Sequence, residues 1–179
     1  DTATVRIPNQ EVQKEFINCI EDGGWEPVMD AIRNSEELLA ATIRGEEETV
    51  ARMIENAHQE NTSILAYNDE NSLACVISLA YYSAKKNYVV YRELAGGKGF
   101  ADMVFVPRKT TQTPAIVVEL KWNKTAEAAI TQIKRKQYVE SLKDYRGEVI
   151  LVGINYESKE LKKDDYKKHS CKIERITMA

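Results

Sequence analysis

The chain has 179 residues, of which 43% are hydrophobic, and its formal net charge is −3. This is enough apolar material for one well-packed core, and no apolar run approaches the roughly 20 residues that a membrane-spanning helix requires. The charge is unevenly divided, because residues 1–70 contain 5 Lys and Arg against 16 Asp and Glu, whereas residues 71–179 contain 20 against 12. The second part is basic, as in a protein that contacts phosphate groups, although solvated lysines on helix faces would give the same balance.

Cysteine and histidine are rare and scattered. The three cysteines, Cys19, Cys75 and Cys171, form no C-x-x-C pair, which indicates reduced thiols and a cytoplasmic location. The two histidines, His58 and His169, argue against a zinc site built from histidine and cysteine, and His58 is predicted to be a surface residue at a helix end. There is no recognisable signal peptide and the chain does not begin with Met, so we expect a piece of a longer protein.

The acidic first third has the spacing of amphipathic helices. Apolar residues recur every three or four positions in three segments, residues 9–22, 27–43 and 49–59. We interpret residues 1–61 as a helical arm or a linker from a preceding domain, and residues 62–179 as the main domain. No pattern in the arm indicates chemistry.

The main domain begins with a helix and continues as strands. Asn68 or Asp69 can cap the helix, and its apolar stripe consists of Leu73, Val76, Ile77, Ala80 and Tyr81. Strand-like segments follow at residues 88–93, 103–106 and 115–119. The glycine-rich segment A-G-G-K-G-F between the first two lacks the spacing of a phosphate-binding P-loop. It is interpreted as a turn, with contact between Lys98 and a phosphate as the alternative.

Acidic and basic residues mark the ends of two of these strands. Asp102 precedes one strand, and Glu119 and Lys121 end the next on one face, because side chains alternate along a strand. If the hairpin is symmetric about the loop between Pro107 and Pro114, Asp102 lies opposite Glu119. Converging acids predict a site for a hard cation. The alternative is that Asp102 caps a turn while the other two form a surface ion pair.

The last part of the chain predicts a helix between two parallel strands. Asn123 or Thr125 can begin a helix that runs to about Tyr145 and ends at Gly147. The apolar run V-I-L-V-G-I that follows is typical of a buried strand, and a strand-helix-strand unit implies a parallel pair. With a final strand at residues 171–178, the pattern predicts an α/β fold with a mixed sheet.

Three strings carry a resemblance to a known family: R-E-L-A-G-G-K-G-F-A-D, V-V-E-L-K-W and A-I-T-Q-I-K. They resemble the PD-(D/E)XK nuclease superfamily, whose restriction-endonuclease-like core runs α-β-β-β-α-β. Within it, they resemble a branch found C-terminal to AAA-type ATPase domains in bacterial proteins. The resemblance covers residues 60–175 approximately. Asp102, Glu119 and Lys121 match the motif, although Ala101 stands where the motif has proline.

The resemblance also implies roles for residues outside the central motif. Glu70, on the first core helix, matches a further acid of the family, and Gln132 matches a polar residue on the helix after the E-x-K strand. Helix-dipole complementation is the alternative for Glu70, and an ordinary surface amide is the alternative for Gln132. The implied metal ligands are Asp102, Glu119, the Leu120 carbonyl and Glu70, and Lys98 and Lys124 are candidate nucleic-acid contacts.

The resemblance implies a Mg²⁺-dependent nuclease, with Mn²⁺ as a substitute, that hydrolyses phosphodiester bonds in nucleic acid, with DNA favoured over RNA. The alternatives are a catalytically silent nuclease-fold module that binds DNA or a protein partner beside an ATPase domain, and a metal hydrolase of small phosphoesters. The expected partners are nucleic acid and an AAA-type ATPase domain in the same full-length chain, without a membrane. A homo-oligomer is left open.

Overall fold

The computed structural model describes residues 25–61, 70–96, 99–108, 113–137, 142, 145–157 and 168–178. The chain divides into two compact units, residues 1–33 and 34–179. Of the first unit, the described part is the beginning of one helix. The helix predicted at residues 9–22 lies outside the described residues. Everything that follows concerns the second unit.

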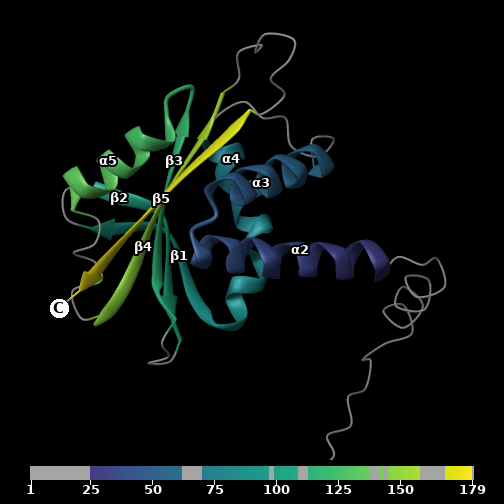
Figure 1. Ribbon diagram of the computed structural model, residues 1–179, viewed down its shortest axis with the longest axis horizontal. Coiled ribbons are helices and arrows are strands. Elements are labelled where there is room, and N and C mark those ends of the chain that lie inside the picture. The colour runs from purple at the N-terminus through teal and green to yellow at the C-terminus, as the bar shows by residue number, and fades with distance from the viewer. Residues whose placement is uncertain are drawn as a thin grey trace, which may run out of the picture. The chain divides into compact units, whose positions relative to one another are not determined.

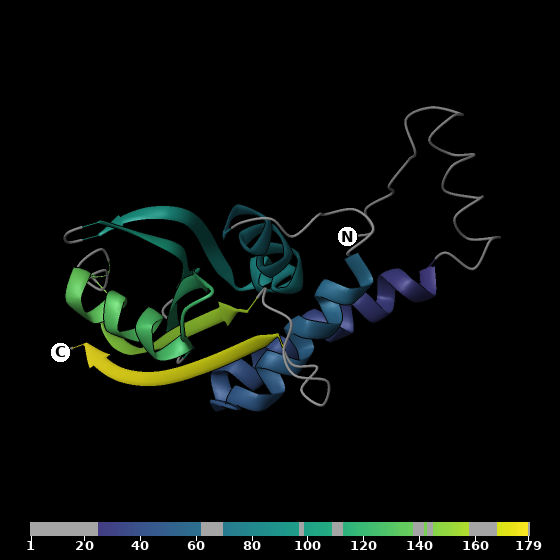
Figure 2. The same ribbon diagram turned by 90° about the horizontal axis from the view of Figure 1, so that it is seen from above.

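Five strands form one mixed sheet. They are β1 (Tyr88–Gly96), β2 (Gly99–Pro107), β3 (Ala115–Trp122), β4 (Gly147–Tyr156) and β5 (His169–Met178). They lie side by side in this order (Figure 1 and Figure 2). Neighbouring strands are antiparallel except β3 and β4, which are parallel. The parallel pair confirms the crossover predicted from the strand-helix-strand pattern.

Helices precede and interrupt the strands. They are α2 (Trp25–Arg44), α3 (Glu47–Asn61), α4 (Glu70–Ala80) and α5 (Ala126–Lys136), with a 3-10 helix, η1 (Tyr82–Lys86), after α4. The elements from α4 to β4 follow the predicted α-β-β-β-α-β order, which confirms the predicted fold class. No helix among those described is both long and apolar enough to span a bilayer.

Alternation along β3 builds a core on each face of the sheet. Ile116, Val118 and Leu120 point to one face, where α4 contributes the predicted apolar stripe. Ala115 and Val117 point to the other face, which α5 covers (Figure 1). Both faces of β3 are therefore buried, and a polar side chain near its end is enclosed by protein.

Two of the helices assigned to the arm, α2 and α3, contribute to this core. Leu38 of α2 and both Val50 and Ile54 of α3 are buried in one apolar cluster with α4 and the sheet. This differs from the boundary expected at residue 62, because a helix with an apolar stripe buries it on the nearest apolar surface. The prediction of a surface location for His58 is wrong, since this side chain is only 6% exposed.

Helix α5 is shorter than predicted. Thr125 caps it as expected, with its hydroxyl accepting a hydrogen bond from the Ala128 amide at 3.0 Å. It ends at Lys136 rather than Tyr145, because Gln137 takes a left-handed conformation with φ of 56° and its amide bonds back to the last turn. The sequence does not mark this end, because Gln137 is not a glycine.

Candidate active site

The end of β3 carries a buried ion pair. Glu119 and Lys121 are 2% and 6% exposed, and they lie on the face covered by α5, as the strand alternation predicted. The Lys121 Nζ donates to Glu119 Oε1 at 2.7 Å. A buried charge is costly unless it is paired and hydrogen-bonded, so this pair is built into the fold and is not the surface ion pair considered as the alternative.

Asp102 joins this pair from β2. The β2–β3 register pairs Met103 with Val118 and Phe105 with Ile116, as the symmetric hairpin predicted, and its continuation puts Asp102 opposite Glu119. Asp102 Oδ2 accepts the Leu120 backbone amide at 2.7 Å. The two carboxylates therefore belong to one end of one hairpin.

Gln132 reaches the same carboxylate from α5. Its Nε2 donates to Glu119 Oε1, the oxygen that also accepts Lys121. This close approach is possible because Gly153 on β4 is the sheet neighbour of Glu119 and presents no side chain to the helix. A Cβ at Gly153 would lie 2.3 Å from the Ala126 carbonyl oxygen.

The Lys121 ammonium bridges two oxygens. Besides Glu119 Oε1 it donates to the Leu120 carbonyl oxygen at 2.9 Å. These are two of the oxygens implied as metal ligands. The lysine therefore occupies, with one positive charge, the space between groups that would bind a divalent cation.

Two of the predicted site residues cannot be located relative to this ion pair. Glu70 is the first residue of α4, but its side chain lies outside the described part, as does Lys98 altogether. Lys124 is exposed, two residues after β3, and its backbone amide donates to Asn155 Oδ1 at 2.9 Å. The side chain of Lys124 is therefore available to solvent beside the strand end.

Two polar residues next to the site were missed by the sequence analysis. Asn155 is 4% exposed, lies beside Lys121 in the sheet and holds the turn that leads to α5 through the Lys124 amide. Its signal was a polar residue at the end of a buried strand, the same signal that identified Glu119. Glu93 lies at the interruption of the β1–β2 pairing opposite Asp102, with a positive φ of 51°. A non-glycine residue in this conformation marks a site where backbone strain is tolerated.

The arrangement has a recognisable architecture. Two carboxylates and a lysine lie at the ends of two adjacent strands in a mixed sheet, and α4 and α5 cover the two faces of that sheet. This arrangement is consistent with the restriction-endonuclease-like class. The family model of the PD-(D/E)XK nuclease superfamily matches residues 68–166, more than half of the chain, and the chain belongs to this superfamily. A comparison with curated proteins gives no match.

Proposed function

We propose that this domain is a metal-dependent nuclease that hydrolyses phosphodiester bonds, in DNA rather than RNA. The observation that carries the proposal is the convergence of Asp102, Glu119 and Lys121 at one end of the β2–β3 hairpin. Members of the superfamily typically use divalent metals. All three motif residues are retained here, which favours an active enzyme over the silent module and over a hydrolase of small phosphoesters.

The donor set fits a hard divalent cation. Asp102 and Glu119 offer carboxylate oxygens and Leu120 a carbonyl oxygen, which are the ligands that Mg²⁺ and Mn²⁺ prefer. The Lys121 ammonium already lies 2.7 Å and 2.9 Å from two of these oxygens, so the protein itself places positive charge there. Glu70 is proposed as a further ligand, supplied directly or through water.

Each side chain then has a distinct task. A bound cation would polarise the phosphoryl oxygen and lower the pKa of a water molecule. Lys121, displaced from Glu119 by that cation, would hold the attacking water or stabilise negative charge on the phosphate. Gln132 acts through Glu119, because its amide fixes the orientation of that carboxylate. Gln132 is therefore proposed as a positioning residue.

Metal affinity should depend on both carboxylates. Asp102→Asn and Glu119→Gln each remove a charged oxygen ligand while keeping the shape of the side chain, so each should weaken Mn²⁺ binding at least about tenfold. Calorimetric titration of Mn²⁺ into the two variants and the parent protein measures this. Glu148→Gln, which changes an exposed carboxylate paired with Arg175, is the matched control. Equal affinity in all four proteins would contradict the assignment.

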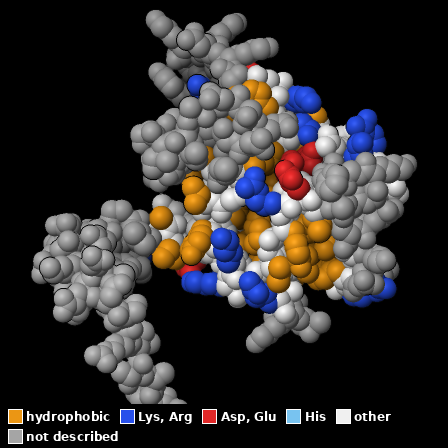
Figure 3. Space-filling view, turned by 180° about the vertical axis from the view of Figure 1, so that it is seen from behind, with side chains coloured by type: hydrophobic (Ala, Val, Ile, Leu, Met, Phe, Trp, Pro, Cys, Tyr) orange, Lys and Arg blue, Asp and Glu red, His pale blue; other side chains and the backbone are white. Residues whose placement is uncertain are grey.

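Basic side chains provide a surface for the phosphate backbone. Figure 3 shows Lys and Arg side chains spread around exposed hydrophobic side chains on the face opposite to that of Figure 1. Tyr82 and Tyr91 are among the large exposed apolar residues, at 55% and 43%, and Lys85 lies over the Tyr82 ring at 4.9 Å. Lysines bind phosphate and exposed tyrosines can stack on bases.

DNA binding should weaken as salt increases, because each phosphate that a lysine or arginine neutralises releases counterions. The logarithm of the binding constant should fall with the logarithm of the salt concentration, with a slope of about −0.9 per phosphate contact on duplex DNA. Lys98→Ala and Lys124→Ala should each make the slope shallower by about that amount. Lys86→Ala, an exposed lysine paired with Glu36, is the control that should leave it unchanged. Fluorescence anisotropy with labelled duplex provides the measurement. Binding that is independent of salt would favour the silent module that recognises a protein.

The cellular setting is part of the proposal. The strings that resemble the AAA-associated branch support a full-length chain in which an ATPase domain precedes this one. The absence of a C-x-x-C pair and the free thiol of Cys171 fit a reducing cytoplasm.

A further inference from the structure

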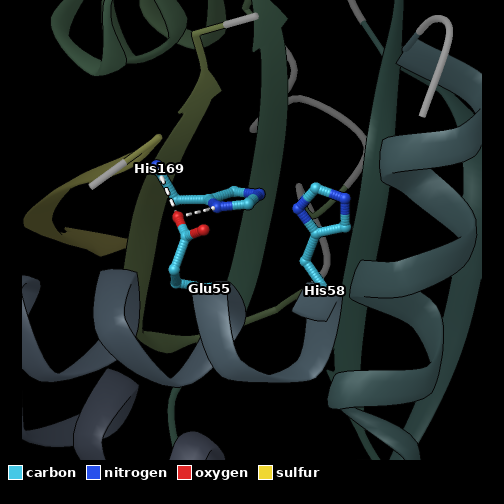
Figure 4. A group of neighbouring side chains, drawn as sticks. All are labelled: Glu55, His58 and His169. Carbon is cyan, nitrogen blue, oxygen red and sulfur yellow. Dashed lines mark hydrogen bonds and ion pairs between the residues drawn. The ribbon is translucent and has the colours of Figure 1, made fainter. Parts of the chain in front are cut away.

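The two histidines of the chain meet on the other face of the sheet. Glu55 and His58 are three residues apart on α3 and therefore lie on one side of that helix. His169 is the first residue of β5 and is the sheet partner of Tyr156, the last residue of β4. Helix α3 packs along β5, so residues far apart in the sequence form one cluster, Glu55–His58–His169 (Figure 4).

Glu55 fixes the orientation of His169. Its Oε2 lies 2.6 Å from His169 Nδ1 and also accepts the backbone amides of Lys168 and His169, both at 3.1 Å. This carboxylate therefore holds the His169 ring in place within the cluster and is itself one of its three possible donors. In Figure 4 the second nitrogen of His169 lies on the ring edge turned toward His58.

The three side chains converge within the reach of one ion. One donor atom from each residue lies within 4.8 Å of the other two, and the His58 and His169 ring centroids are 5.3 Å apart. His58 and His169 are only 6% and 4% exposed. Both imidazole rings pack against the ring of Tyr156. Zinc ligands lie about 2.0–2.2 Å from the metal, so binding would draw the three donors closer together.

We propose that Glu55, His58 and His169 bind a divalent transition-metal ion, for which Zn²⁺ is the best fit. Two imidazoles and one carboxylate are the ligands of His₂Glu zinc sites, whereas Mg²⁺ avoids nitrogen and prefers oxygen. The scarcity of histidine and cysteine argues against a zinc site built from those two residue types, and here the third ligand is a glutamate. The candidate active site offers only oxygen, so the two sites should select different metals.

The ion would link α3 to the first residue of β5, at the end of the sheet that carries the candidate active site. Tyr156 stacks on Trp122 with ring centroids 4.5 Å apart, and its carbonyl accepts the Asn123 amide at 2.8 Å. Trp122 directly follows Lys121. Binding at the cluster would therefore support the turn between β3 and α5 through Tyr156, and a stabilising role is proposed for the ion.

The test uses a background that lacks the active-site ligands. The Asp102→Asn/Glu119→Gln double variant is stripped with a chelator and titrated with Zn²⁺ by calorimetry, and with Co²⁺ by visible absorption. We expect one equivalent of Zn²⁺, an absorption spectrum of four-coordinate Co²⁺, and a thermal midpoint that rises with Zn²⁺ but not with Mg²⁺. Because the background lacks the Asp102 and Glu119 carboxylates, these results do not depend on the proposed nuclease activity.

Two further variants locate the binding. His58→Asn and Glu55→Gln, each added to the same background, should weaken Zn²⁺ binding at least about tenfold. Glu48→Gln, an exposed carboxylate on the same helix, is the matched control and should leave it unchanged. Failure of the double variant to bind Zn²⁺ would overturn the proposal, and so would equal binding in all the added variants. The Co²⁺ spectrum of the double variant tests the ligand set even where an added substitution disturbs folding.

Discussion

Replacing Lys121 with methionine should lower the rate of DNA cleavage at least about tenfold while strengthening the binding of a divalent cation. Methionine keeps the length of the side chain but removes the ammonium. That ammonium lies 2.7 Å from Glu119 Oε1 and 2.9 Å from the Leu120 carbonyl oxygen, where it competes with the metal. Cleavage and metal affinity should therefore change in opposite directions, which simple loss of folding cannot produce.

The stability of this variant should depend on metal. Without a cation, Glu119 is left buried without its lysine, and breaking a buried ion pair costs about 3–5 kcal/mol. Mn²⁺ should restore the thermal midpoint and shift it by more than in the parent protein. Lys86→Met, at an exposed lysine, is the control for charge removal. Full activity in Lys121→Met would contradict the role of the lysine, and weaker Mn²⁺ binding would contradict the competition.

Gly153→Ala should be among the most destabilising single-methyl additions in the domain. The new Cβ would lie 2.3 Å from the Ala126 carbonyl oxygen and 2.9 Å from the Ala129 Cβ, so α5 must move away from β4. Overpacking of a core costs about 3 kcal/mol, which corresponds to a fall of roughly 6–12 °C in the thermal midpoint. The shift of α5 should also move Gln132 away from Glu119 and lower activity.

Gly45→Ala is the comparison for Gly153→Ala, because it introduces backbone strain without steric crowding. Gly45 has φ of +82° between α2 and α3, and an added Cβ there meets no atom within 4 Å. This change should cost only about 1–2 kcal/mol, the penalty of a left-handed residue with a side chain. Thermal unfolding of both variants gives the comparison. A smaller loss for Gly153→Ala than for Gly45→Ala would refute the close contact between α5 and β4.

Local patterns were sufficient for the hairpin and the ion pair. Strand alternation put Glu119 and Lys121 on one face, and two prolines bracketing the loop gave the register that brings Asp102 to Glu119. These features depend on neighbours in the sequence or on a single short loop. For the same reason, the start of the crossover helix and the parallel pairing of the strands on either side of it could be predicted.

Features that lack a local sequence marker, or that depend on distant contacts, could not be predicted. The end of α5 at Gln137 follows from backbone hydrogen bonds, without a glycine to mark it. Glu55 and His169 are 114 positions apart, and only the packing of α3 on β5 brings them together. The spacing of Glu55 and His58 on one helix face is compatible with a metal site. It points to one specifically only when His169 is known to lie beside them. The burial of His58 also results from the packing of α3 on β5.

Cleavage of labelled DNA under single-turnover conditions tests the central claim most directly. The parent protein, Asp102→Asn, Glu119→Gln and Glu148→Gln are each incubated with duplex, single-stranded and branched DNA, and with RNA, in Mg²⁺, Mn²⁺ or EDTA. We predict cleavage of DNA by the parent and by Glu148→Gln only when metal is present, and a loss of at least about 100-fold in the other two variants. Cleavage that persists in EDTA or in both active-site variants would contradict the account, as would an inactive parent protein that still binds DNA.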